Sequence, residues 1–240
     1  MFAISVLIPC YNEEPYIEMA VDSVITQSFE DWELVIVDDG SDDGTSEILD
    51  YLLLKYCRYP INVITQPHLG CTAATKNAIE CANSPLCTIF GGDDILDKDS
   101  LKVIVSYFKK HPELGFSWSK YHQRSDTETV WRGGRSKPLP KGKSLKDALL
   151  EGWWGALAQQ SFRKSAYLQT TGLDPRIPYV MDQQVASLFA MANIPSWHMP
   201  IVTYYHLQHS KQMSAVHYGD QQACRRVILE RMGGTYVREK

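Results

Sequence analysis

The sequence predicts an α/β protein whose central sheet is mostly parallel and is flanked by helices. Continuous apolar segments rich in β-branched residues recur through the first hundred residues, which is typical of strands covered on both faces. Segments with apolar residues at helical spacing separate these strands, and polar clusters follow them. Because strands and helices alternate at regular intervals, we expect right-handed crossovers between parallel strands.

Four strands and three helices are expected in the first half. Pro15 fits the first turn of its helix, where its missing N–H is not needed. Asp42 or Asp43 can cap the second helix through a side-chain oxygen. The strands are expected at residues 3–10, 32–41 (ending in acid and turn residues), 61–66 and 86–90, and the helices at residues 13–28, 42–56 and 71–83.

Beyond residue 100 the alternation weakens, although helices and strands are still expected. A loop rich in Gly, Pro and Lys covers residues 133–144, and a turn ends the segment 166–174. The helices are expected at residues 100–111, 144–159, 180–193 and 220–232, and the strands at 115–122, 127–133 and 197–210. We expect one domain with halves at residues 1–100 and 101–214, followed by a C-terminal amphipathic helix and tail at 215–240.

The charge distribution is uneven although the net charge is only −4. Residues 1–100 carry 4 Lys and Arg against 18 Asp and Glu, whereas residues 101–165 carry 13 against 5. The acidic first half excludes a nucleic-acid groove there, because nothing basic would neutralise the phosphates. The basic middle can meet an anionic acceptor or a lipid surface, and a solvated lysine-rich loop is the simpler alternative.

Cysteine usage and hydropathy indicate a cytoplasmic protein. The six cysteines show no CxxC and no paired metal spacing, which favours reduced thiols. No run of about 18 apolar residues occurs, so no spanning helix is expected. The apolar start lacks a basic leader and is expected to be a buried strand, not a signal peptide. The arginines of the last helix can touch anionic lipid at the inner face of the membrane, or the helix can simply pack on the domain.

Three polar clusters follow predicted strands of the first half. They are PCYNEE at residues 9–14, DDGSDDG at 38–44 and GGDD at 91–94. In open α/β sheets, ligands bind beyond the carboxyl ends of the strands. The fold itself would therefore bring these clusters together around one ligand.

Several segments in fixed order resemble family-two glycosyltransferases with the GT-A fold. They are SVLIPCYNEEPYIEMAVDSVITQSFEDWELVIVDDGSDDGT, QPHLGCTAATKNAIECA and GGDDIL, and the resemblance extends over roughly residues 4–210. It implies a Rossmann-like sheet with a nucleotide-sugar-binding first half and an acceptor-binding second half. It also implies inverting transfer of a sugar from a nucleotide diphosphate sugar, by family habit a UDP-sugar, to a saccharide, lipid-linked or other hydroxyl acceptor.

The resemblance assigns five residues outside the GGDD cluster to the nucleotide. Tyr11 would offer an aromatic face to a pyrimidine, although a packed aromatic is the alternative, and Asp39 would accept the ring N–H. Pro9 would shape the turn, and Glu13 falls in the same segment. Lys76 stands where arginine is usual and could reach phosphate or base, although a solvated lysine is nearly as good an interpretation.

The resemblance also implies a divalent cation, Mn²⁺ or Mg²⁺, that stabilises the departing diphosphate. Asp94 is expected to ligate the cation and Asp93 to reach the ribose or the cation; the alternative is that this pair caps the following helix. Gly91 stands where many members have an acid. His209 is in register with a late family histidine that can bind metal or phosphate, whereas His206 is expected to be an exposed polar residue.

The general base is expected at Asp182. An inverting transfer needs a carboxylate near the acceptor hydroxyl. Residues 172–174 match the first part of the family segment and Asp182 its last acid, whereas Met181 replaces the usual Glu. A carboxylate in a first helical turn can also be a cap. Trp153 and Trp154 fall in the acceptor region, where stacking on a sugar and packing in the core are equally good interpretations.

A second hypothesis is a catalytically silent protein that binds sugar nucleotides or assembles with partners. Gly91, Met181 and Lys76 all depart from the common family pattern, as they would in an inactive descendant. A sugar-nucleotide pyrophosphorylase is a weaker third idea, because the Gly-rich loop with Arg or Lys that it needs after the first strand is missing.

Overall fold

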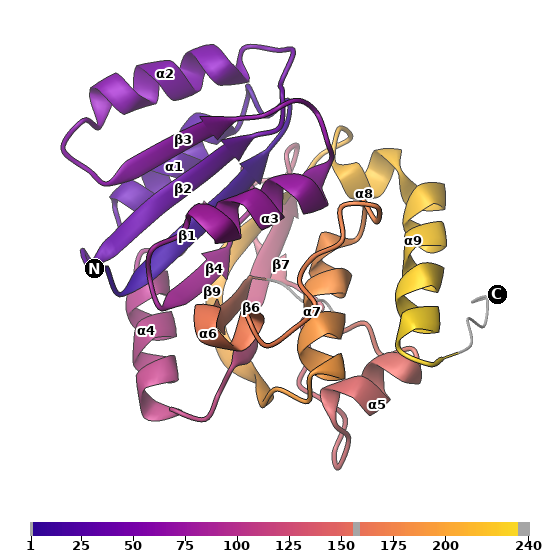
Figure 1. Cartoon of the computed structure of the whole chain (residues 1–240). Coiled ribbons are helices and arrows are strands. Elements are labelled where there is room, and N and C mark those ends of the chain that lie inside the picture. The colour runs from indigo at the N-terminus through magenta and orange to yellow at the C-terminus, as the bar shows by residue number, and fades with distance from the viewer. Residues whose placement is uncertain (1, 156–158, 235–240) are drawn as a thin grey trace.

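A computed structural model describes residues 2–155 and 159–234 of the chain (Figure 1). Strands from both halves of the sequence join one sheet in the order β3-β2-β1-β4-β8-β6-β9-β5, and β7 pairs with β6. The strands are β1 Ile4–Cys10, β2 Trp32–Asp38, β3 Ile61–Thr65, β4 Leu86–Ile89, β5 Ile95–Leu96, β6 Phe116–Ser125, β7 Arg132–Gly133, β8 Gln160–Arg163 and β9 Ser196–Gln208.

Helices cover both faces of this sheet. Alternate side chains of β1 and β2 point to opposite faces, so each strand contributes to two hydrophobic clusters. One cluster packs under α1, α2 and α4, and the other under α3, α5, α7 and α9. The helices are α1 Ile17–Ile25, α2 Thr45–Lys55, α3 Cys71–Cys81, α4 Ser100–Lys110, α5 Leu145–Leu150, α6 Lys164–Tyr167, α7 Met181–Met191, α8 Met213–Val216 and α9 Tyr218–Arg231.

The first half confirms the predicted parallel sheet. β1 pairs in parallel with β2 and β4, and β2 with β3. The register pairs Cys10 with Asp38, so the carboxyl ends of β1 and β2 stop at the same edge. The polar clusters that follow these strands therefore start side by side.

The second half differs from the sequence prediction in several places. The predicted helix over residues 144–159 ends at Leu150, because Gly152 has a φ of +85° and the N–H of Trp153 turns back to the carbonyl of Ala148. The residues 156–158 that this prediction included lie outside the described part. Next, β8 was not predicted; it pairs antiparallel with both β4 and β6 and so joins the two halves of the sheet.

Helix ends shift for local reasons. Pro15 precedes α1 instead of lying in its first turn. Asp43 does bond the N–H of Thr45 at the start of α2, although Gly44 is the N-cap residue. The strand expected at residues 127–133 is limited to β7.

The C-terminal helix α9 packs on the domain. Its Ile228 and Leu229 are buried, it contacts α7, and the Arg231 guanidinium lies 2.7 Å from the Asp174 carboxylate. Of the predicted tail, residues 235–240 lie outside the described part. Among the described residues no helix has the length and apolar character to cross a bilayer, and all six cysteines are unbonded thiols.

Candidate active site

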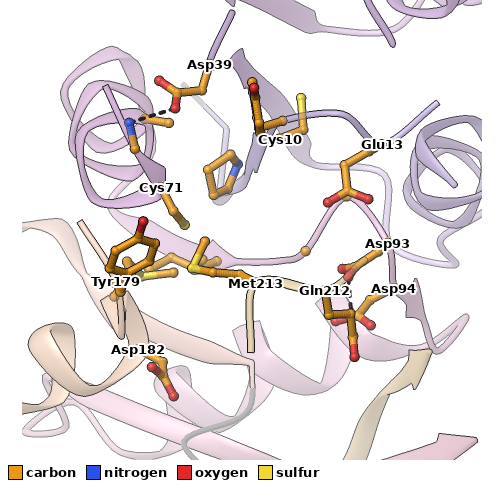
Figure 2. A pocket seen from close by; sticks show the side chains of 18 of the residues that line it. Cys10, Glu13, Asp39, Cys71, Asp93, Asp94, Tyr179, Asp182, Gln212 and Met213 are labelled. Atoms are coloured by element: carbon orange, nitrogen blue, oxygen red, sulfur yellow. Dashed lines mark hydrogen bonds between the residues drawn. The ribbon is translucent and has the colours of Figure 1, made fainter. Parts of the chain in front are cut away.

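A cavity of about 1340 Å³ opens at the carboxyl ends of β1, β2 and β4. The loops after these strands form one side, and the beginnings of α7, α8 and α9 form the other, as Figure 2 shows in part. The predicted site residues that line it are Pro9, Tyr11, Glu13, Asp39, Asp93, Asp94, Asp182 and His209. Lys76, Trp153 and Trp154 are not among the lining residues.

Asp39 organises the loop after β3. Its buried carboxylate accepts hydrogen bonds from the backbone N–H groups of Leu69 at 3.0 Å and Gly70 at 2.8 Å, and from the Gln66 side chain at 2.6 Å. Gly70 has a φ of +92°, a conformation that glycine adopts without steric cost, and α3 begins directly after it. Asp39 thereby joins the loops after β2 and β3 into one wall of the cavity.

Tyr11 and His68 form a stacked pair at this wall. Their ring centroids lie 4.0 Å apart with an interplanar angle of 27°, and His68 Nδ1 lies 2.9 Å from Asp39 Oδ2. Tyr11 keeps 38% of its surface exposed and lines the cavity. The predicted aromatic and acceptor groups for a pyrimidine thus lie in one corner.

Asp94 is held by β9. Its Oδ1 accepts from the N–H of Leu207 at 3.1 Å and lies 2.9 Å from His206 Nδ1. Burial, and then the neighbouring Asp93, raise the pKa of Asp94 to about 6, against the hydrogen bond to His206. The expected exposure of His206 is therefore wrong: its side chain is 27% exposed and is ordered by Asp94.

The alternative that the aspartate pair caps the next helix is also wrong. Helix α4 starts at Ser100, after β5, and its N-cap residue is Asp99. The N–H of Leu101 bonds the Gln27 side chain instead. Asp93 faces His209 instead: its Oδ2 lies 3.1 Å from His209 Nε2.

The Glu13 side chain lies close to those of Asp93 and His209. One ligand atom from each of the three side chains lies within 4.8 Å of the others. Figure 2 shows the carboxylates of Glu13 and Asp93 facing each other. Burial, and then the charges of Asp93, Asp94 and Asp43, raise the pKa of Glu13 to about 9. Carboxylates are the ligands that a hard cation prefers, and His209 adds an imidazole nitrogen, which Mn²⁺ accepts more readily than Mg²⁺ does, so the donor set fits the divalent cation that the sequence implies.

The two glycines before the aspartates leave space for these side chains. A Cβ added at Gly91 would lie 2.6 Å from Asp93 Oδ1. A Cβ at Gly92 would lie 3.2 Å from the Cβ of Cys10 and 3.3 Å from the Cγ of Glu13. Position 91 therefore has no room for an acid while Asp93 keeps this orientation.

Asp182 lies in the first turn of α7, away from the Glu13–Asp93 pair (Figure 2). Val180, directly before the helix, has a φ of +56°, which β-branched residues rarely adopt. Burial raises the pKa of Asp182, whereas the Gln183 N–H and the charge of Arg225 lower it. A carboxylate with a raised pKa is better matched to accepting a hydroxyl proton near neutral pH.

Arg225, on α9, contacts the residues around Asp182. Its Nε donates to Gln183 Oε1 at 2.9 Å, and its guanidinium lies 5.7 Å from the ring centroid of Trp154. These contacts hold the positively charged guanidinium of Arg225 near Asp182.

We expect Arg225→Gln to shift the acidic limb of the pH–activity profile upward by about 0.5 to 1 pH unit. Asp182 must be ionised to accept a proton, so activity falls as pH decreases through its raised pKa, and loss of the nearby cation raises that pKa further. Besides Arg225, the cavity groups Cys71 and Tyr204 interact electrostatically with Asp182. The measurement is kcat/KM against pH.

Arg226→Gln is the matched control, because it removes the same charge from a side chain that is 62% exposed and lies 3.9 Å from Glu230. Arg225→Lys should keep most of the wild-type profile. An equal shift in the Arg225→Gln and Arg226→Gln variants would contradict a specific effect on Asp182.

The two tryptophans and Lys76 lie outside the cavity wall. Both tryptophans pack against the core cluster, and Trp153 meets Trp118 edge to face with centroids 5.7 Å apart. Lys76 is a partly buried residue of α3. Their predicted roles would require movement toward the ligand.

Several lining residues were not predicted from the sequence. His68 and Cys71 follow β3, so the rule that carboxyl ends of parallel strands share an edge could have found them. Gln212, which donates to the carbonyl of Leu207 and contacts Asp93, comes from a segment with no strand signal. Tyr179 and Met213 lie on the Asp182 side of the cavity in Figure 2, and Val216 and His217 also line the cavity.

Comparison of the sequence with known proteins identifies a matching family. The family model described as "Glycosyl transferase family 2" matches residues 5–169. The hyaluronan synthase of Pasteurella multocida is 24% identical over 238 residues, which are 97% of this chain and 24% of the synthase. The putative teichuronic acid biosynthesis glycosyltransferase TuaG of Bacillus subtilis is 34% identical over 118 residues, 49% of this chain and 46% of TuaG. The chain therefore spans less than half the length of either relative.

The fold is also similar to solved structures. The crystal structure of Staphylococcus aureus TarS in complex with UDP-GlcNAc has a TM-score of 0.73 and 20% sequence identity, and the match covers 99% of this chain and 68% of that chain. A mannosyltransferase from Pyrobaculum calidifontis has a TM-score of 0.63 and 16% identity, covering 95% of this chain and 62% of that one. These likenesses confirm the GT-A-like fold.

Proposed function

The chain belongs to glycosyl transferase family 2, and from this premise we propose that it transfers a sugar from a nucleotide diphosphate donor to a hydroxyl acceptor with inversion. The observation that carries the proposal is that one cavity contains all three kinds of group that this reaction needs. These are an aromatic corner with Asp39, the Glu13–Asp93–His209 cluster, and Asp182.

The donor nucleotide is proposed to bind between the loops after β1 and β3. Tyr11 would stack on the base and Asp39 would accept its ring N–H, with Pro9 setting the direction of the loop. Asp93 is proposed to reach the ribose. The TarS structures contain UDP and UDP-GlcNAc, which supports a uridine nucleotide in the related fold. We leave Lys76, Trp153 and Trp154 out of this binding scheme, because they do not line the cavity.

A divalent cation is proposed at the acidic end of the cavity, held by Asp93, Asp94 or His209. Bound there, it would stabilise the negative charge of the departing diphosphate as a Lewis acid. The mannosyltransferase neighbour was solved with GDP-Man and Mn²⁺, which supports Mn²⁺ or Mg²⁺ for this family fold.

Asp182 is proposed to accept the proton of the acceptor hydroxyl. The oxygen of that hydroxyl forms the new bond to the anomeric carbon while the bond to the diphosphate breaks on the opposite face, so the configuration inverts. Tyr179 and Met213, beside Asp182 in Figure 2, would form the floor of the acceptor region. The names of two relatives, a hyaluronan synthase and a putative teichuronic acid biosynthesis glycosyltransferase, support a saccharide acceptor. A lipid-linked acceptor and a place of action in the cytoplasm near the membrane are part of the same proposal.

A donor screen tests the proposal. The protein is incubated with UDP-, GDP- and TDP-sugars, a panel of saccharide acceptors and Mn²⁺, and the released nucleotide diphosphate is measured. We expect one uridine donor to be turned over, and activity to fall when EDTA is added. Metal-independent binding of UDP in calorimetry, together with no donor turnover, would instead favour the catalytically silent binding protein.

A further inference from the structure

We propose that Glu13 is itself a ligand of the divalent cation, together with Asp93 and His209, and that it replaces the acid absent at position 91. This role rests on the proposed function, because the cation serves the same donor site. It assigns the third protein ligand to the loop after β1, far in sequence from the aspartate pair.

The three side chains are brought together from three separate segments. Glu13 follows β1, Asp93 follows β4 and His209 follows β9, and one ligand atom from each lies within 4.8 Å of the others. Ligand–metal distances for Mg²⁺ are about 2.0–2.1 Å, so atoms on opposite sides of one ion lie about 4.2 Å apart. Neighbouring ligands of an octahedral ion lie about 3 Å apart, so the three atoms must move closer together to hold one ion.

Two atoms of this group are buried without a hydrogen-bond partner. They are Glu13 Oε2 and His209 Nδ1. The His209 side chain is 3% exposed and its ring stacks on Tyr16 with centroids 4.4 Å apart. Buried polar atoms in folded proteins are nearly always bonded, so the unbonded Glu13 Oε2 points to a missing partner beside Asp93. Two facing carboxylates select a cation as that partner.

The backbone of Glu13 is fixed in place. Its N–H donates to Thr45 Oγ1 at 2.8 Å, and its carbonyl accepts from the N–H groups of Tyr16 at 2.8 Å and Ile17 at 2.9 Å. The side chain passes close to Gly92, where a Cβ would lie 3.3 Å from Glu13 Cγ. Glu13 is thus held with its carboxylate toward Asp93, as Figure 2 shows.

The composition of the GGDD segment fits the same assignment. An acid at position 91 would bring its Cβ to 2.6 Å from Asp93 Oδ1. Position 91 therefore cannot supply the additional carboxylate without displacing Asp93. Glu13, on the neighbouring loop after β1, brings its carboxylate close to that of Asp93 instead.

The test is a Mn²⁺ titration followed by electron paramagnetic resonance, in which bound Mn²⁺ loses the signal of the free ion. Wild type, Glu13→Gln and Glu14→Gln are titrated with and without saturating UDP. Glu14 is the matched control, because it is the next residue, and its Oε2 accepts only a loop N–H from Gly44 at 3.2 Å among the described contacts. Gln keeps the volume of Glu, so the fold is retained, and circular dichroism checks this.

We expect Glu13→Gln to weaken Mn²⁺ binding in the presence of UDP at least about tenfold, and Glu14→Gln to leave it within about twofold. Adding Mn²⁺ to the UDP complex should also raise the melting temperature of wild type more than that of Glu13→Gln. Equal Mn²⁺ affinity in wild type and Glu13→Gln would overturn the assignment, as would a wild type that binds no Mn²⁺ with UDP. Sugar transfer is measured separately in the donor screen, so either failure leaves the proposed function to its own test.

Discussion

Asp182→Asn is expected to lower kcat for sugar transfer by about 10²- to 10⁴-fold, the usual contribution of a general base. Asn has nearly the same shape as Asp but cannot accept the hydroxyl proton. The Asp182 side chain lies apart from the Glu13–Asp93 pair, so donor and cation binding should be retained. The measurements are initial rates of UDP release with acceptor present, and calorimetric binding of UDP with Mn²⁺.

The control for this variant is Asp220→Asn. Asp220 lies at the beginning of α9, and its side chain is 64% exposed and contacts His217 at 3.3 Å. This change removes the same charge from the same side of the domain without touching the proposed base. Undiminished transfer by Asp182→Asn would remove the assignment of the base, whereas equal loss in both variants would indicate a general effect of charge.

The first half of the fold could be predicted because its local signals agree with one another. The strands from Ile4 to Ile89 are continuous apolar segments, and the helices between them have clear spacing. A parallel sheet then determines which loops meet, so the convergence of Tyr11, Asp39 and Asp93 followed from topology without any knowledge of contacts.

The second half was harder because its structure depends on long-range packing. β8 consists of four residues, Gln160–Arg163, and is stabilised by its pairing with β4 and β6 instead of by a strong local pattern. Gly152 ends a helix whose apolar spacing continues past it. A helical period predicts which face is buried but not where a glycine will reverse the chain.

The details of the site depended on contacts between distant residues. His206 lies 112 positions from Asp94 and was expected at the surface, yet these two side chains bond. Arg225 was considered only as a surface cation, although it contacts Gln183 beside the proposed base. Tertiary structure determines which side chain a titratable group contacts. The spacing of residues in the sequence therefore does not predict that contact.

Asp39→Asn is expected to raise the Kd for UDP by about 10- to 100-fold. The variant loses an acceptor for the ring N–H of the nucleobase, and it also loses hydrogen bonds that order the neighbouring loop. Gly70 donates its N–H to one carboxylate oxygen, and Leu69 and the Gln66 side chain donate to the other. An amide has one acceptor oxygen, so its NH₂ would face at least one of these donors. Leaving one buried donor unbonded costs about 1–3 kcal/mol.

The measurement is calorimetry of UDP binding, with steady-state kinetics showing a raised donor KM and a smaller change in kcat. Asp42→Asn in the same loop is the control, because its exposed carboxylate bonds the Asn12 side chain at 2.7 Å and does not line the cavity. If the Asp39→Asn variant bound UDP as tightly as wild type, the nucleobase would have to bind elsewhere in the cavity. A fall in kcat alone, with unchanged KM, would mean that Asp39 acts on the transition state and not on donor binding.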